Sequence, residues 1–147
     1  MQLNGYFLRP AAISDLQDIH SLICALEEQT FEYQEFEKAY SKNLQNPDVF
    51  YQAALVNNRV IAFGSLQIQT LLHHCGPVAE IQELYVVPEY RCRGLGGQIV
   101  RKLKEKALES GCAILEVSCD RGRFESHRFY EQQGFAGSHF KFTLKLS

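Results

Sequence analysis

The sequence predicts a single domain of the mixed α/β class (α+β), and three observations lead to that prediction. The chain has 147 residues, enough to bury one hydrophobic core without disulfide bonds. Its 46% hydrophobic and 22% charged residues are typical of a globular protein. Stretches rich in β-forming residues alternate with stretches of helical spacing, and no repeat or low-complexity tract interrupts them. We therefore treat residues 1–147 as one domain.

The first part of the chain predicts one strand followed by helical segments. Residues 7–10 form a short apolar strand, and a capping box follows, with Ser14 as the N-cap residue and Gln17 three positions later. Residues 27–46 are acidic and aromatic and predict a helix with a break. The first helix is expected to bury an apolar stripe made of Leu16, Ile19, Ile23 and Leu26.

Three strands are expected next. Residues 50–56 and 60–69 are rich in β-forming residues and are separated by a short polar turn, which predicts a hairpin. The Cys-Gly-Pro sequence at 75–77 predicts another turn. Residues 80–87 then predict a third antiparallel strand that ends before a proline.

The remaining residues predict a helix, a strand, a helix and a last strand. Good helix formers occupy residues 95–110, and Gly111 follows as the residue that closes this helix. Residues 113–119 predict a strand, and residues 126–133 predict a short helix that Gly134 ends. A final strand is expected from the alternating apolar residues Phe140, Phe142, Leu144 and Leu146.

Composition and charge exclude several classes of protein. No apolar run approaches the roughly 20 residues that a membrane-spanning helix needs, and the N-terminus lacks the pattern of a secretory signal peptide. The net charge of −2 argues against general nucleic-acid binding. The five cysteines include no C-x-x-C pair, so we expect neither a disulfide framework nor a zinc knuckle. A reducing, cytoplasmic setting follows as the expectation.

The charges are divided unevenly along the chain. Residues 1–90 carry 4 Lys and Arg against 11 Asp and Glu, whereas residues 91–147 carry 11 against 6. Because the second part is basic, we expect it to attract a ligand rich in phosphate.

A glycine-rich loop lies between the strand at 80–87 and the helix at 95–110. Glycines let a backbone approach a ligand closely, and the unpaired N–H groups and dipole of a helix N-terminus favour an anion. The arginines of the loop would add charge-assisted hydrogen bonds to phosphate. A P-loop would need Gly-Lys-Ser/Thr and a dinucleotide fold a second βαβ unit, and both are absent. A loop that uses glycine only to turn tightly stays the alternative. The loop consists of Arg91, Cys92, Arg93, Gly94, Leu95, Gly96 and Gly97.

Residues 80–96, with two glutamates, a Pro-Glu-Tyr and the glycine-rich loop, resemble the strand-four and pyrophosphate-loop signature of the GNAT acetyltransferase superfamily. Residues 8–11 and 127–135 resemble the same family, in the right order along the chain. The resemblance implies a GNAT-type fold, with a mixed, largely antiparallel sheet of about six to seven strands and about four helices. A closer similarity, to bacterial aminoalkylphosphonate N-acetyltransferases, rests on the segments 22–24, 72–74, 80–84, 127–130 and 138–142.

The resemblance implies acetyl-CoA as co-substrate and assigns residues to it. The backbone of Leu84, Tyr85 and Val86 would pair with the pantetheine arm, and the glycine-rich loop would hold the pyrophosphate. Asp120 and Ser126, near the start of the last helix, are further expected contacts. Asp120 stands where many relatives have asparagine, which leaves the contacts of that segment open.

The resemblance also assigns the acid and the base of a direct transfer. Tyr130 falls where the family has its tyrosine general acid, and it is expected to touch the cofactor as well; a core aromatic is the alternative. Glu80 and Glu83 are the candidate bases. In a regular strand they face opposite sides, with Glu80 beside Leu84, and we favour Glu80, with Glu83 as substrate contact or alternate base. Cys92 lacks a histidine to activate it as a nucleophile.

The acceptor is expected to be a small primary amine, and a group bearing an anion would suit the basic residues His73, His74, His139 and Lys141. Surface histidines at 73 and 74, and a solvated strand face at 139 and 141, are the alternatives. A divalent cation held by a histidine with Glu80 or Glu83 is an alternative. The rival acceptors are a polyamine, an aminoglycoside or a protein N-terminus, which the acidic run at 27–37 would favour. A CoA-binding sensor without turnover is the rival of another class. Neither a nucleic acid nor a membrane is expected as partner, and a homodimer is expected from fold analogy alone.

Overall fold

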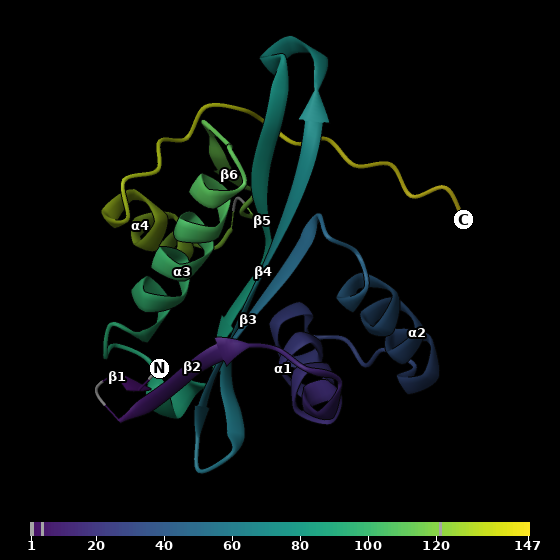
Figure 1. The fold of residues 1–147 in the computed structure, drawn as a ribbon, viewed down its shortest axis with the longest axis vertical. Coiled ribbons are helices and arrows are strands. Elements are labelled where there is room, and N and C mark those ends of the chain that lie inside the picture. Colours follow the sequence, from purple (N-terminus) through teal and green to yellow (C-terminus); the bar gives the residue numbers. More distant parts are fainter. Residues whose placement is uncertain (1, 4, 121) are drawn as a thin grey trace.

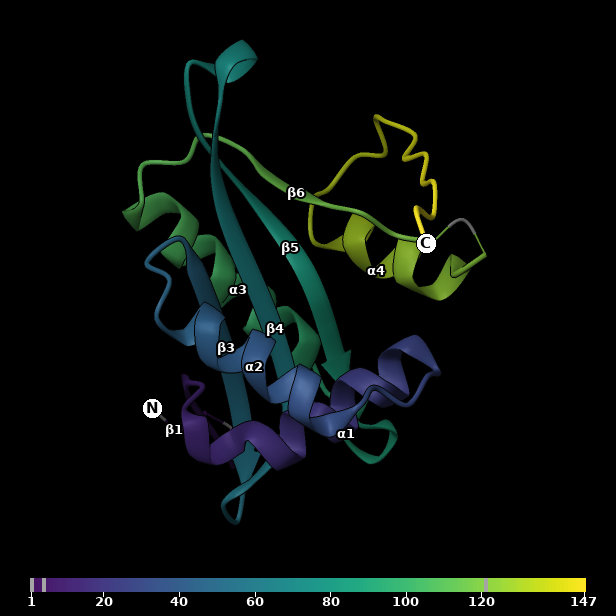
Figure 2. The same cartoon turned by 90° about the vertical axis from the view of Figure 1, so that its right-hand side faces the viewer.

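The computed structural model describes residues 2–3, 5–120 and 122–147. Within them, a six-stranded sheet carries helices on both faces (Figures 1 and 2). The elements follow the chain as β1 (Gln2–Leu3), β2 (Tyr6–Pro10), α1 (Leu16–Glu27), α2 (Tyr33–Leu44), β3 (Val49–Val56), β4 (Arg59–Leu71), β5 (Gly76–Val86), α3 (Leu95–Glu109), β6 (Leu115–Val117) and α4 (Phe124–Gln132).

The sheet keeps the order of the chain, from β1 at one edge to β6 at the other. Neighbouring strands run antiparallel except for β5 and β6, which are parallel. Figure 1 shows α1 and α2 on one side of the sheet and α3 and α4 on the other. The mixed α/β class, the largely antiparallel sheet and the four helices expected from the sequence are therefore confirmed. None of the helices in the described residues combines the length and the apolar character needed to span a membrane.

The core lies between the sheet and these helices. The apolar stripe of α1 is confirmed, because Leu16, Ile19 and Ile23 are buried and Leu26 packs against the core. On the other face α3 lies very close to the sheet: a Cβ added at Gly64 of β4 would come within 2.5 Å of the Ile99 side chain. Each fully buried aliphatic side chain contributes about 2 kcal/mol by leaving water.

The first helix begins differently from the expectation, because Ser14 is not its N-cap residue. A short 3₁₀ turn at Ile13–Asp15 leads into α1, and the stabilising side chain is Asp15. Its carboxylate accepts the Ala12 backbone N–H at 2.8 Å and pairs with both terminal nitrogens of Arg9, at 2.7 and 2.9 Å. Arg9 supplies two hydrogen bonds to a buried carboxylate, so the helix start is fixed to β2 rather than by a serine hydroxyl.

The hairpin between β3 and β4 is confirmed. Asn57 and Asn58 form its two-residue turn with φ of 50° and 64°. This left-handed conformation at both positions matches the twist of the flanking strands, and asparagine tolerates it better than most residues. The turn expected at 75–77 lies slightly earlier, since a 3₁₀ turn occupies Leu72–His74 and Gly76 already opens β5.

The pairing of β4 with β5 contains a bulge. Ser65 faces Glu83 and the next residue, Leu66, faces Ile81, so Gln82 is an extra residue on β5. An extra residue shifts the alternation of side chains by one position. As a result Glu80 and Glu83 lie on the same face of the sheet, whereas a regular strand would separate them. Leu84 lies on the opposite face, near Gly64 and α3, and not beside Glu80 as expected.

The final strand expected from Phe140, Phe142, Leu144 and Leu146 is wrong for this structure. Residues 135–147, all of them described, contain no strand, and these four side chains are 72–92% exposed. Alternation supplies an apolar face, but a strand also needs a partner for its hydrogen bonds. The neighbouring edge strand offers little, because only Leu115–Val117 of the expected 113–119 form β6.

The ion pair of Asp15 makes stability depend on pH. Burial raises the pKa of Asp15, but the hydrogen bonds from Arg9 and Ala12 outweigh burial and lower this pKa below its ordinary value. Such a group stabilises the fold above the unfolded pKa of about 3.9, and this contribution is lost as the pH falls through the folded pKa. Asp15→Asn should lower the free energy of unfolding at pH 7 by about 2 kcal/mol.

Urea denaturation at several pH values measures this effect. The loss of stability on acidification below pH 4 should be smaller in Asp15→Asn than in the natural chain. Asp48→Asn, at an exposed loop position, is the matched control and should leave the profile unchanged. Equal acid sensitivity in both variants and the natural chain would contradict the role of Asp15.

Candidate active site

The sheet opens between β5 and β6. Pairing of these two strands ends at Ile81 and Val117, whereas β5 continues to Val86 and stays paired with β4 on its other side. Within the described residues, the β6-facing backbone of 82–86 therefore has no strand partner. Such an edge offers N–H and C=O groups to an extended ligand that adds as a further strand. This edge includes Leu84, Tyr85 and Val86, the residues assigned to the pantetheine arm.

The glycine-rich loop leads into the N-terminus of α3 beside this edge. Cys92 and Gly94 adopt left-handed conformations, with φ of 62° and 79°. The first hydrogen bond of the helix runs from Gln98 N to Gly94 O, so the N–H groups of residues 95–97 have no partner within the helix. A Cβ at Gly94 would meet nothing within 4 Å, which means that conformation rather than space requires glycine there.

Gly96 and Gly97 have a second role that the sequence did not reveal. A Cβ at Gly96 would lie 3.2 Å from the ring of Phe129, and one at Gly97 would lie 3.3 Å from the amide of Gln133. Both neighbours come from the α4 region. These two glycines therefore let α4, the helix that carries Tyr130, pack closely against the start of α3.

Two arginines flank the loop at the surface. Arg91 donates its Nε–H to the Val86 carbonyl at 2.7 Å, and its guanidinium lies 5.1 Å from the centre of the Tyr85 ring. Arg93 lies over Tyr90 at 5.4 Å. Unpaired helix N–H groups and two guanidinium groups are donors that suit a diphosphate. The residues present therefore fit the pyrophosphate and pantetheine parts of CoA.

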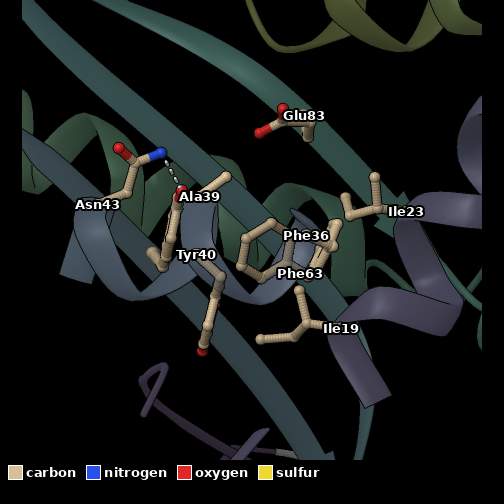
Figure 3. A pocket seen from close by; sticks show the side chains of 9 residues that line it. Ile19, Ile23, Phe36, Ala39, Tyr40, Asn43, Phe63 and Glu83 are labelled. Carbon is tan, nitrogen blue, oxygen red and sulfur yellow. Dashed lines mark hydrogen bonds between the residues drawn. The ribbon is translucent and has the colours of Figure 1, made fainter. Parts of the chain in front are cut away.

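Two adjoining cavities lie on the face of the sheet that α1 and α2 cover; both helices line the inner one, and only α2 lines the outer one. The inner cavity has a volume of about 120 Å³, and its lining is mainly aromatic and aliphatic (Figure 3). Of the described residues that line it, Glu83 alone is charged. The outer cavity, of about 190 Å³, is polar and includes the side chains of Gln67 and Gln82. Three residues line both cavities: Asn43, Tyr51 and Glu83.

Stacked aromatic rings form the wall of the inner cavity. The rings of Tyr40 and Tyr51 are parallel within 4°, with centres 5.5 Å apart, and Tyr51 contacts Phe63 at 5.2 Å. Phe36 extends the stack on the far side of Tyr40. These contacts fix the ring of Tyr51, and they leave Glu83 facing a largely apolar space (Figure 3).

Glu83 is held by Ser65, the residue opposite it on β4. The buried Ser65 hydroxyl donates to the Glu83 carboxylate and accepts the Glu83 backbone N–H at 2.9 Å. Burial raises the pKa of Glu83, the Ser65 hydrogen bond lowers it, and the nearby Glu27 raises it, so the net direction is upward. A carboxylate whose pKa is raised by burial is a better proton acceptor than a solvated one.

Glu80 has a more exposed setting on the same face. Its two oxygens accept hydrogen bonds from the Gln82 amide at 3.0 Å and from the Ser118 hydroxyl at 3.2 Å. It lines neither cavity. Glu83 is therefore the glutamate that lines the cavities, although the sequence favoured Glu80.

Tyr130 lies on α4 with its ring against Phe129 and Phe135, at 5.2 and 5.7 Å. Burial raises the pKa of Tyr130 to about 12; the nearby Cys119 adds to this effect, and Arg123 opposes it. The phenol is therefore protonated throughout the neutral range, as a general acid must be.

The two remaining candidates for cofactor binding, Asp120 and Ser126, contact residues in and around the loop before α4. The Asp120 carboxylate accepts the Gly122 N–H at 2.8 Å, and its carbonyl oxygen is 2.7 Å from a ring nitrogen of His127. The Ser126 hydroxyl interacts with the Cys119 thiol. Both side chains thus have partners within their own segment.

The residues expected to bind the acceptor do not line the cavities. His73 and His74 sit at the tip of the β4–β5 hairpin with their rings 4.3 Å apart, roughly 20 Å along the strand from Glu83. His139 and Lys141 are exposed in the C-terminal tail. In the described part of the chain, no group of three or more His, Cys, Asp or Glu side chains is arranged to hold a metal ion. The structure therefore does not bring either histidine to Glu83.

Sequence reasoning missed Asn43, Tyr51 and Ser65. Ser65 could have been found, because a serine in the middle of an apolar strand indicates a buried polar contact. The sequence contains no such signal for Asn43 and Tyr51, because their positions depend on how α2 packs across β3.

The bond between Ser65 and Glu83 gives a prediction that does not depend on activity. Because the hydroxyl stabilises the ionised carboxylate, Ser65→Ala should raise the pKa of Glu83 further. NMR titration of side-chain-labelled glutamate measures this pKa. The control is Ser118→Ala, which should leave the Glu83 titration unchanged. An unchanged or lowered Glu83 pKa in Ser65→Ala would contradict the arrangement.

Comparison with known proteins agrees with this geometry. Residues 14–135 match the model of the acetyltransferase (GNAT) family. An aminoalkylphosphonate N-acetyltransferase of Salmonella typhimurium is 38% identical over 95% of this chain and 90% of that protein. A glucosamine 6-phosphate N-acetyltransferase of Dictyostelium discoideum is 26% identical over 97% of this chain and 92% of that protein.

Solved structures share the fold. An aminoglycoside N-acetyltransferase in complex with CoA superimposes with a TM-score of 0.86 at 18% identity, covering 97% of this chain and 95% of that one. A transcriptional regulator from Bacillus halodurans reaches 0.88 at 21% identity, covering 96% and 99%. The family match, the 38% identical relative and the opened sheet beside a glycine-rich loop agree: the chain belongs to the acetyltransferase (GNAT) family.

Proposed function

We propose that this chain transfers an acetyl group from acetyl-CoA to the primary amine of a small acceptor by direct attack. One observation carries the proposal. Glu83 lines a partly open cavity, and it belongs to the same run of β5 whose β6-facing edge has no strand partner among the described residues. Donor and acceptor can therefore meet at one strand without a covalent enzyme intermediate.

The donor would be held by residues that have few other partners. The backbone of Leu84 to Val86 would bind the pantetheine arm, and the N–H groups of residues 95–97 with Arg91 and Arg93 would bind the pyrophosphate. Acetyl-CoA supplies the activated acyl group. The protein contributes the position and the proton transfers.

The proposed base is Glu83. An alkylamine with a pKa near 10 is almost fully protonated at pH 7 and must lose a proton before it attacks. Glu83 would take that proton because it faces the cavity and its pKa is raised. Glu80 would contribute less, since it lies outside the cavities and is bonded to Gln82 and Ser118.

The proposed acid is Tyr130. The leaving thiolate gains a proton most easily from a neutral donor nearby. The raised pKa keeps the Tyr130 phenol protonated at neutral pH, and α4, which carries it, packs against Gly96 at the start of α3. A CoA-binding sensor would need neither this acid nor a base in the cavity, so the enzyme is the stronger proposal.

The proposed acceptor is an aminoalkylphosphonate or a related small amine. The 38% identical relative acts on aminoalkylphosphonates, which supports this class. Among the described residues, no Lys, Arg or His lines either cavity, so neutral donors such as Gln67 and Gln82 would bind the acidic end. The lack of a cationic side chain in the described lining, together with Glu83 and the nearby Glu27, favours a polyamine or aminoglycoside as the second candidate.

The cytoplasmic setting and the homodimer stay proposals. All five cysteines are free, which supports a reducing compartment. The exposed apolar side chains of the C-terminal tail, such as Phe142 and Leu146, support association with a second copy.

Release of CoA thiol from acetyl-CoA tests the proposed function. The panel should include 2-aminoethylphosphonate, aminomethylphosphonate, spermidine, an aminoglycoside and a short peptide. Release with the phosphonates supports the first acceptor class, and release with only the cationic amines supports the second. Binding of acetyl-CoA without turnover of any amine would contradict the proposed enzyme.

The choice of base gives a kinetic prediction. Glu83→Gln should lower kcat/KM at pH 7 by about a hundredfold or more, because it removes the proton acceptor but keeps the shape of the side chain. Glu80→Gln is the matched control and should change kcat/KM by less than about threefold. The deficit of Glu83→Gln should shrink toward pH 10, where the amine is deprotonated by solvent. A larger loss in Glu80→Gln would return the base role to that residue.

The role of Tyr130 gives a second kinetic prediction. Tyr130→Phe should lower kcat by at least about tenfold, since it removes only the proton of the leaving-group acid. The Kd for CoA, measured by calorimetry, should change by less than about threefold. Equal losses in kcat and in affinity would mean that the hydroxyl serves binding rather than proton transfer.

A further inference from the structure

The residues at the junction of the two cavities form a row across three strands. Tyr51 of β3 faces Ser65 of β4, and Ser65 faces Glu83 of β5, so all three lie on the same face of the sheet. The backbones of the two outer residues are roughly 10 Å apart. Because serine is small, it leaves room for a ligand between the hydroxyl of Tyr51 and the carboxylate of Glu83.

The hydroxyl of Tyr51 has a fixed position, and its hydrogen has no acceptor among the residues that the structure describes. Asn43 of α2 donates its amide N–H to the Tyr51 oxygen at 2.7 Å, the bond drawn as a dashed line in Figure 3. Asn43 is a donor in this bond, so it leaves the hydrogen of Tyr51 available to a ligand. Ring contacts with Tyr40 and Phe63 prevent the side chain from turning away. The hydroxyl is therefore an oriented hydrogen-bond donor that can bind an oxygen of a ligand.

The neighbouring groups favour an oxygen on the ligand. The outer cavity adds the amides of Gln67 and Gln82 to the same space, and these are neutral hydrogen-bond donors. Burial raises the pKa of Tyr51, which keeps it protonated and able to donate. An acceptor whose amine is bonded to Glu83 would thus place the atoms that lie a few bonds from that amine against the hydrogen-bond donors of Tyr51, Gln67 and Gln82.

We infer that Tyr51, oriented by Asn43, is a specificity-determining residue that donates a hydrogen bond to an oxygen of the acceptor a few bonds from its amine. The inference rests on the proposed function and narrows its substrate class to amines that carry a nearby oxygen, as in a phosphonate, phosphate or alcohol. Alkylamines without oxygen leave this half-buried donor unpaired and are poor acceptors, since an unpaired polar group shielded from water costs binding energy.

Matched amines test the inference. One pair is 2-aminoethylphosphonate and n-propylamine, and the neutral pair is 3-amino-1-propanol and n-butylamine. Tyr51→Phe should raise KM for the oxygen-bearing member of each pair about tenfold or more, with little change in kcat. KM for the alkylamines should stay within about twofold, so the preference for oxygen collapses.

Asn43→Asp supplies a second variant with the shape of the natural side chain. The introduced carboxylate accepts hydrogen bonds only, so it would draw the hydrogen of Tyr51 away from the ligand and shift KM in the same direction. Tyr33→Phe is the matched control, because the Tyr33 side chain is exposed and lines neither cavity. Melting temperatures of all three variants establish that they fold.

Calorimetric binding of the same amines in the presence of CoA separates the inference from the proposed function. At least tenfold weaker binding of 2-aminoethylphosphonate to Tyr51→Phe supports the inference even if turnover is absent, in which case only the proposed function fails. Unchanged binding and KM in Tyr51→Phe overturns the inference while the function stands. A fall of kcat with every amine, or no binding of either pair by the natural chain, overturns it as well.

Discussion

One extra residue in a β-strand determines the geometry of this molecule. The bulge at Gln82 shifts the alternation of β5, so that Glu83 joins Tyr51 and Ser65 on the face covered by α1 and α2. Without the extra residue, a side chain at position 83 would point toward α3 and the core on the other face. The site therefore depends on local backbone geometry more than on any single side chain, and bulges near functional sites commonly redirect side chains in this way.

The proposed function uses two different surfaces of the same strand. Its free backbone edge beyond Ile81 suits the donor, because β6 ends at Val117, and its side chain at Glu83 faces the acceptor cavity. The glycine-rich loop lies beside this edge and contacts α4: Gly94 sets the loop conformation, and Gly96 allows the contact with Phe129. The proposed phosphate site and the helix that carries Tyr130 thus both depend on the packing of α4 against the start of α3.

Much of the fold could be predicted from the sequence because it depends on local patterns. The stripe of α1, the Asn-Asn turn and the loop before α3 follow from spacing and from residue types with known backbone preferences. The N-cap of α1 could not be predicted, because Asp15 takes its partner from Arg9 on another element. The tail from Phe140 has the pattern of a strand, but pattern alone supplies no partner. The sequence did not show that Glu83 rather than Glu80 lines the cavities, because this depends on the bulge in β5. The hydrogen bond between Asn43 and Tyr51 could not be predicted either, because it depends on the packing of α2.

The account depends most on the claim that the acceptor amine lies against Glu83 beside the free edge of β5. The most direct measurement is a crystal structure with CoA and an acceptor that supports turnover. The account predicts the pantetheine arm along residues 82–86 and the acceptor nitrogen within hydrogen-bond distance of the Glu83 carboxylate. An acceptor bound outside the two cavities would contradict it. An amine bonded to Glu80, with Glu83 hydrogen-bonded only to Ser65, would contradict it as well.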